Sequence, residues 1–136
     1  MLDIRGITKI YNPGTVQEMC LFNDFSLSIG DGQFVSVVGS NGSGKASLLN
    51  LICGSITPDA GSIVMNGRDI AKDKEFVRSR VIGRVYQNPA MGTCGSMTIL
   101  ENLSLADHKG KPAGLRPGTD KKRTSAYRDI LRPLGL

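Results

Sequence analysis

The sequence lacks several features that would assign it to a function class at once. Its 136 residues contain no tryptophan, one histidine and three cysteines, and aromatic residues make up 5%. A lone histidine excludes any site that needs two histidines from this chain. Cys20, Cys53 and Cys94 are spaced too widely for a zinc cluster or a disulfide framework, which fits a reducing cytosol. No apolar run approaches the ~18 residues of a membrane-spanning helix. The length and composition predict one ordinary soluble globular domain.

Net charge is also absent from most of the chain. Residues 1–106 carry nine Lys or Arg and nine Asp or Glu, whereas residues 107–136 carry eight basic and three acidic residues, which accounts for the net charge of +5. A basic tail can meet an acidic partner, a lipid surface or nucleic acid, but it is more often a solvated face. Tyr127 is the only aromatic residue among the basic residues of the tail. Stacking of aromatic side chains on nucleobases is therefore disfavoured, and we expect no nucleic-acid partner.

Strand and helix patterns alternate along the chain, and this alternation predicts an α/β layered fold. Gly, Pro and charged residues in 109–120 predict a loop. Asn66-Gly67 predicts the tight turn of a hairpin, because both positions tolerate positive φ. Thr98 and Glu101 form a capping-box pattern at the start of a helix. The predicted strands are 2–10, 25–29, 34–38, 62–65, 68–70 and 81–86, and the predicted helices are 46–53, 98–106 and one from about residue 124.

The strongest local signal is a glycine-rich loop that ends in lysine. It follows the predicted strand 34–38 and opens the predicted helix 46–53, which is the context that a phosphate-binding loop requires. Backbone N–H groups wrap phosphate oxygens only where side chains are absent, and the helix directs its positive dipole end at the same anion. Lysine adds a mobile full charge. The loop residues are Gly39, Ser40, Asn41, Gly42, Ser43, Gly44 and Lys45.

One position departs from the usual pattern of such loops. The residue after the lysine is normally Ser or Thr, whose hydroxyl ligates Mg²⁺, but here it is Ala46. Ser47 follows, but one residue along a helix is a rotation of ~100°, so we expect its hydroxyl to contact an inner phosphate instead. The sequence therefore predicts that ATP binding is retained and that Mg²⁺ coordination is weakened.

Together with other motifs, the loop resembles the ATP-binding subunit of ABC transporters from Met1 to about Ala106. The loop alone is shared by many NTPases, whereas the combination is far more specific. The motifs are Val37–Lys45, Leu48–Gly54, Pro58–Ile63, Asn66–Ile70, Val85–Gln87 and Met97–Leu103. The resemblance implies part of a P-loop NTPase core, with an N-terminal antiparallel β-subdomain and the start of an α-helical subdomain. It divides the chain into a nucleotide-binding core with the β-subdomain, 1–87, and a partial helical subdomain with the basic tail, 88–136.

The resemblance also implies roles for individual residues. Tyr11 follows the first strand, where the family places an aromatic ring that stacks on adenine. Lys45 and Gln87 match catalytic positions, and Gln87 matches the glutamine that reaches Mg²⁺ and the attacking water. The implied partners are ATP, integral-membrane transporter subunits and, in the complete protein, a second copy. The implied location is the cytoplasmic face of the cell membrane.

Several motifs of the family are not found in these 136 residues. They are the signature sequence, the Walker B strand that ends in acidic residues, and the switch histidine, a position that His108 does not occupy. We therefore expect a truncated domain that does not hydrolyse ATP at a useful rate on its own, since phosphoryl transfer depends on positioning and charge neutralisation. The alternative is a non-hydrolytic nucleotide-binding fragment or a degenerate module.

Overall fold

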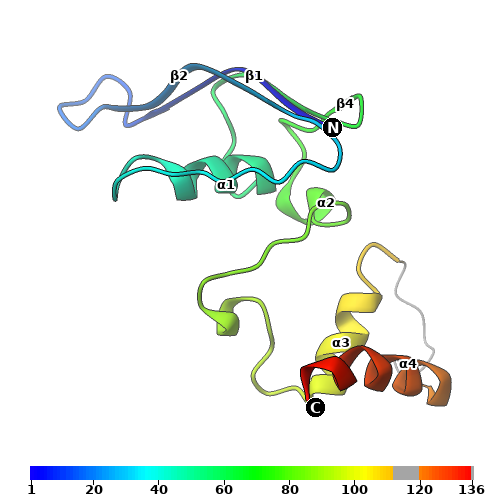
Figure 1. Cartoon of the computed structure of the whole chain (residues 1–136). Coiled ribbons are helices and arrows are strands. Elements are labelled where there is room, and N and C mark those ends of the chain that lie inside the picture. The colour runs from blue at the N-terminus through cyan, green and yellow to red at the C-terminus, as the bar shows by residue number, and fades with distance from the viewer. Residues whose placement is uncertain (112–119, 136) are drawn as a thin grey trace. The chain divides into compact units, whose positions relative to one another are not determined.

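The computed structural model describes residues 1–111 and 120–135. The chain divides into two units, Met1–Arg78 and Ser79–Leu136 (Figure 1). The predicted division at residues 87 and 88 is a functional one and stays a prediction. Of the predicted loop 109–120, residues 112–119 lie outside the described residues.

An antiparallel sheet of four strands forms the first unit, in the order β2-β1-β3-β4. It confirms the predicted β-subdomain and the strands 2–10 and 25–29. Asn66 and Gly67 have φ of 50° and 81° and form the predicted turn between β3 and β4. The sheet buries Ile4, Ile7 and Ile63, which are at most 3% exposed. The strands are β1 (Leu2–Tyr11), β2 (Met19–Ile29), β3 (Ala60–Met65) and β4 (Arg68–Asp69).

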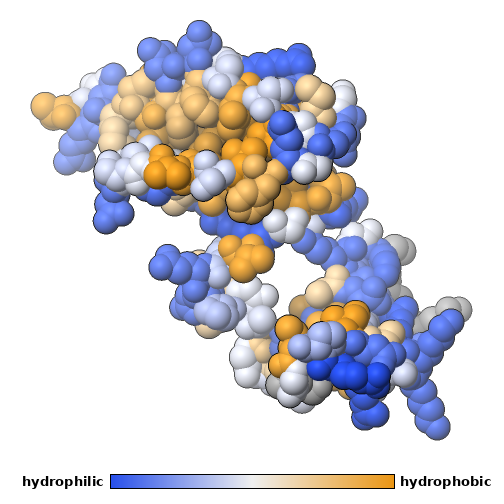
Figure 2. All heavy atoms as spheres, viewed as in Figure 1, coloured by the Kyte–Doolittle hydropathy of each residue, from blue (hydrophilic) through white to orange (hydrophobic). Residues whose placement is uncertain are grey.

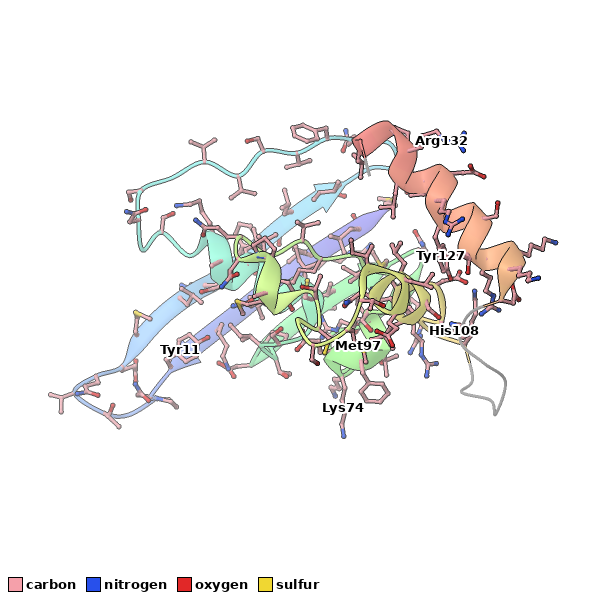
Figure 3. All side chains as sticks on the ribbon, turned by 90° about the horizontal axis from the view of Figure 1, so that it is seen from below. Tyr11, Lys74, Met97, His108, Tyr127 and Arg132 are labelled. Carbon is pink, nitrogen blue, oxygen red and sulfur yellow. The ribbon has the colours of Figure 1, made fainter. Side chains whose placement is uncertain are left out.

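Helix α1 (Lys45–Cys53) lies along one face of this sheet (Figures 1 and 3). Leu48 and Leu51 are three residues apart, so they share a face of the helix, and both are buried. Gly54 ends the helix with φ of 90°, in the left-handed conformation that glycine adopts without steric cost. The predicted helix 46–53 and its glycine C-cap are both confirmed.

A buried arginine fixes the C-terminal end of α1. Arg78, the last residue of the short helix α2 (Glu75–Arg78), is 1% exposed. Its guanidinium Nη1 donates to the carbonyl oxygens of Leu51 and Ile52 at 2.6 and 3.1 Å. Nη2 and Nε donate to those of Ala71 and Asp73 at 2.8 and 2.9 Å. The positive charge therefore lies at the negative end of the α1 dipole, where it is most favourable.

Two predicted strands, 34–38 and 81–86, are absent. Both segments are irregular, and Phe34, Val38 and Val85 are at least 90% exposed. Among the described residues, 34–38 form no backbone hydrogen bond with another segment. β-Branched and aromatic residues favour a pleated surface only where a neighbouring strand pairs with it, so propensity without a partner does not produce a strand. Figure 2 shows hydrophobic residues at the surface of the first unit.

The second unit consists of short helices. The 3₁₀ turn η1 (Pro89–Met91) precedes helix α3 (Ile99–Asp107), which begins with the predicted capping box. Thr98 Oγ1 accepts from the Glu101 amide, and the Glu101 carboxylate accepts from the Thr98 amide at 2.7 Å. Helix α4 (Lys121–Leu131) continues into the 3₁₀ turn η2 (Arg132–Leu134).

Polar contacts join α3 to α4. The hydroxyl of the buried Tyr127 donates to Asp107 Oδ2 at 3.1 Å, and Arg123 lies 2.8 Å from Nε2 of His108 (Figure 3). The helix predicted from about residue 124 therefore exists and begins three residues earlier, after the N-cap Asp120. Within residues 1–111 and 120–135, no helix has the length and apolar character needed to cross a bilayer.

Candidate functional site

The phosphate loop, residues Gly39–Lys45, has the backbone that its glycines predict. Gly42 and Gly44 have φ of 83° and 87°, a region that residues with a Cβ rarely adopt. A Cβ on Gly39 would lie 2.6 Å from Ser43 Oγ, so a side chain there would require the Ser43 hydroxyl to move. The loop therefore curls back on itself, with Ser43 N donating to Ser40 O at 3.3 Å. A curled loop without side chains at these positions can turn backbone amides toward an anion.

Lys45 carries the full positive charge of this loop. Its Nζ donates to the carbonyl oxygens of Gly39 and Ser40 at 2.7 and 2.6 Å, and lies 3.4 Å from Ser43 Oγ. The ammonium group thus lies over the loop rather than pointing into solvent. An ammonium has three donors that rotate freely, so it can move between these carbonyls and a phosphate oxygen with little rearrangement.

The N-terminus of α1 also faces this loop. Gly44 is its N-cap and offers no side-chain hydrogen bond, and the first turn contains no acidic residue. The positive end of the helix dipole is therefore not neutralised by its own side chains. Ala46 is exposed at the second helical position and has no oxygen for a cation, whereas the half-buried Ser47 carries a hydroxyl one residue later. The site suits a polyanion and, at position 46, does not suit Mg²⁺.

Tyr11 ends β1, as Figure 3 shows, and its side chain is half-buried. Tyr11 pairs with Met19 of β2, and Lys9, two residues earlier, pairs with Phe22. A Cβ on Gly44 would lie 3.6 Å from the Phe22 ring, so the phosphate loop packs against β2 close to this end of the hairpin. The fold thus brings the predicted base-stacking residue and the phosphate loop to the same end of the β1–β2 hairpin.

Gln87 lies in the second unit, at a bend just before η1, and is exposed. It is in a different unit from the phosphate loop, and its assignment to Mg²⁺ and water stays a prediction. Asn41 and Ser40 are exposed loop residues whose side chains are free to reach an anion. The structure therefore groups every predicted nucleotide contact of residues 11–47 within the first unit.

Sequence reasoning missed two residues that shape this unit. Arg78 anchors the far end of α1, and Asp59 binds Lys9 and the backbone of Ile10 beside Tyr11. An arginine in a polar segment is normally expected to be exposed to solvent, so nothing in the sequence indicated that Arg78 is buried. Asp59 lies in the motif Pro58–Ile63, where its turn position already explains an acidic residue.

The arrangement agrees with what comparison with known proteins shows. A family model for the ABC transporter matches residues 22–136. The chain is 42% identical over 116 residues to a tyrosine transport ATP-binding protein of Clostridioides difficile, covering 85% of this chain and 46% of that protein. It is 36% identical over 117 residues to the sulfate/thiosulfate import ATP-binding protein CysA of Pseudomonas aeruginosa, covering 86% of this chain and 32% of that protein.

A solved structure gives the same result. The ATP-binding cassette MJ0796, in a dimeric post-hydrolysis state bound to ADP and Pi, superposes with a TM-score of 0.75 at 25% identity. The match covers 97% of this chain and 56% of that one, so the chain spans about half the length of the relatives it matches. The sheet and helices are those of a partial P-loop NTPase fold. The chain belongs to the ABC transporter family, among its ATP-binding proteins.

Proposed function

We propose that this chain is the ATP-binding part of an ABC-type transport system and that its phosphate loop holds the triphosphate of ATP. The observation that carries the proposal is the curled, glycine-spaced loop, with Lys45 over it, at the uncapped start of α1. Two relatives are named for different cargo, tyrosine and sulfate or thiosulfate. What this chain shares with both is therefore the nucleotide-binding part rather than a cargo site.

In this proposal, different groups of the site contact different parts of ATP. Backbone amides from Gly39 to Gly44 and the first turn of α1 bind phosphate oxygens, and Lys45 transfers its hydrogen bonds from the loop carbonyls to the outer phosphates. The hydroxyl of Ser47 contacts an inner phosphate, and adenine stacks on Tyr11. ATP supplies the free energy that the transport system uses.

Mg²⁺ is held weakly in this proposal because Ala46 offers no oxygen. The prediction is that Ala46→Ser increases the dependence of ATP affinity on Mg²⁺, while affinity without metal stays unchanged. Titration of ATP into both variants by calorimetry, with Mg²⁺ and with EDTA, measures this. An equal Mg²⁺ effect in the two variants would contradict the role given to position 46.

Hydrolysis is expected to be negligible for this chain alone, in which Gln87 and Lys45 are the proposed catalytic residues. The alternative is a chain that binds nucleotide without hydrolysing it in any assembly. A phosphate-release assay on the purified chain tests the first statement, because turnover that Lys45→Ala abolishes would overturn it. Release that appears only with transporter subunits present would exclude the alternative.

The proposed partners are integral-membrane transporter subunits on the inner face of the cell membrane and a second ATP-binding domain. The solved relative MJ0796 is a dimer, which supports the second partner. No nucleic-acid partner is proposed.

The central experiment is ATP binding to the whole chain with and without the Lys45 charge. Lys45→Ala is expected to weaken ATP affinity by at least about tenfold, since one charge-assisted hydrogen bond contributes ~1.5–3 kcal/mol. Lys122→Ala is the matched control, because Lys122 is an exposed lysine of α4 in the second unit. Equal affinity in all three proteins would refute the proposed site.

A further inference from the structure

Asp59 forms hydrogen bonds with three consecutive residues near the end of β1. Its carboxylate accepts from Ile10 N at 2.7 Å and from Lys9 Nζ at 2.8 Å, and its own amide donates to Thr8 O at 2.9 Å. The Ile10 amide, followed by the Lys9 ammonium, holds the pKa of Asp59 below its ordinary value. Asp59 is therefore a carboxylate at neutral pH, and both of its oxygens are engaged.

Lys9 is held against the ring of Tyr11. The Lys9 side chain is only 15% exposed, and its Nζ lies 5.5 Å from the centroid of the Tyr11 ring. That distance is within the ~6 Å at which a cation is attracted to an aromatic face. Asp59 holds the same ammonium at 2.8 Å, so Lys9 is fixed over one face of the ring.

We propose that Asp59 and Lys9 form a clamp that orients the Tyr11 ring so that its opposite face receives the adenine of ATP. This inference rests on the proposed function, and it concerns how the stacking residue is held. Lys9 and Asp59 are positioning residues in this scheme, since they act on the base through Tyr11. A ring that is already oriented loses less side-chain freedom when the base binds, and this raises affinity.

The charges decide which part of the nucleotide the clamp affects. Lys9 and Asp59 neutralise each other across 2.8 Å, so the pair has little net attraction for phosphates. Lys45, in contrast, lies over the phosphate loop. The clamp should therefore affect binding of the base and leave binding of a polyphosphate unchanged.

The experiment compares ATP with inorganic tripolyphosphate, which has no base, in calorimetric titrations of the whole chain. Lys9→Met is expected to weaken ATP affinity about two- to fivefold and to leave tripolyphosphate affinity unchanged. Asp59→Asn should act in the same direction, and it also serves if Lys9→Met does not fold. Lys9→Arg, which keeps a cation near the ring, should retain ATP affinity. The control is Lys74→Met, since Lys74 is an exposed lysine of the first unit whose side chain points away from the sheet (Figure 3).

A second readout separates positioning from general damage to the fold. In a Tyr11→Ala background, Lys9→Met should cause no further loss of ATP affinity, because the ring that it orients is gone. Unchanged ATP affinity in both clamp variants, or an equal loss for ATP and tripolyphosphate, would overturn the clamp. If the clamp is overturned but Tyr11→Ala still weakens ATP binding, the proposed function stands without the clamp. If the unmodified chain binds neither ligand, the proposed function fails as well.

Discussion

Strand β1 and residues 34–38 are similar in character, but their fates in the fold differ. Both contain β-branched residues suited to a strand. β1 pairs with β2 on one side and with β3 on the other, and it buries Ile4 and Ile7. Residues 34–38 pair with no described strand, and their side chains are exposed. The difference shows that a strand is made by its neighbours as much as by its own residues.

A similar contrast separates two helix N-termini. α3 begins with a reciprocal capping box of Thr98 and Glu101, which satisfies orphan amides with side chains. α1 begins at Lys45, after the N-cap Gly44, without a side-chain cap. The capping box therefore stabilises the start of α3. At the start of α1, no side-chain cap competes with an anion for the backbone amides, which is the arrangement that the proposed ATP site needs.

The largest expected contrast is in amide hydrogen exchange. Ladder amides of β1 should exchange roughly 10³-fold more slowly than the amides of 34–38, because the former open only when the unit unfolds. Exchange measured by mass spectrometry or NMR tests this. Comparable protection of the two segments would show that 34–38 is paired in solution.

Loss of the Arg78 guanidinium should destabilise the packed first unit and so reduce the contrast with the unpaired residues 34–38. Arg78→Met is expected to lower the free energy of unfolding by about 4 kcal/mol, because the buried carbonyls of Leu51, at the end of α1, and of Ala71 lose their donor. Urea unfolding measures this, and Arg80→Met, at an exposed arginine, is the control. A change below about 1 kcal/mol would mean that water replaces the guanidinium without cost.

Two side-chain substitutions by alanine test how much burial contributes to stability at a packed and at an exposed position. Ile63→Ala, in β3 at 0% exposure, should destabilise the chain by about 3 kcal/mol through the cavity it leaves. Val38→Ala, at 90% exposure, should change stability by less than about 0.5 kcal/mol. Urea unfolding of both variants measures the difference. Similar losses would place Val38 in a packed core in solution.

The smallest expected effect concerns pH and the cap of α3. The Thr98 amide and then the Thr98 hydroxyl lower the pKa of Glu101 below its ordinary value of 4.5. The folded state therefore favours the carboxylate, so this stabilisation is complete above pH 4.5 and is lost as the pH falls through the lowered pKa. Glu101→Gln should reduce the acid-induced loss of stability, measured by urea unfolding at neutral and acidic pH. The same change at the exposed Glu75 should leave it unaltered.

Local motifs were predictable because each depends on residues a few positions apart. The positive φ of Asn66-Gly67, the Thr98–Glu101 capping box and the curl of the phosphate loop are all set within seven residues or fewer. In each case the backbone conformation or hydrogen bond that defines the motif forms within the motif itself. The sequence alone therefore determined the turn of the hairpin, the capped helix and the curled glycine-rich loop at which we propose that phosphate binds.

Only the tertiary structure decided features whose partners are distant in the chain. Arg78 reaches the Leu51 carbonyl 27 residues away, and Asp59 reaches Lys9 across 50 residues. The failure of 34–38 to become a strand belongs to the same group, since it depends on the absence of a pairing strand among the described residues. Local propensity specifies what a segment can form, and the free energy of long-range pairing and burial decides whether it forms.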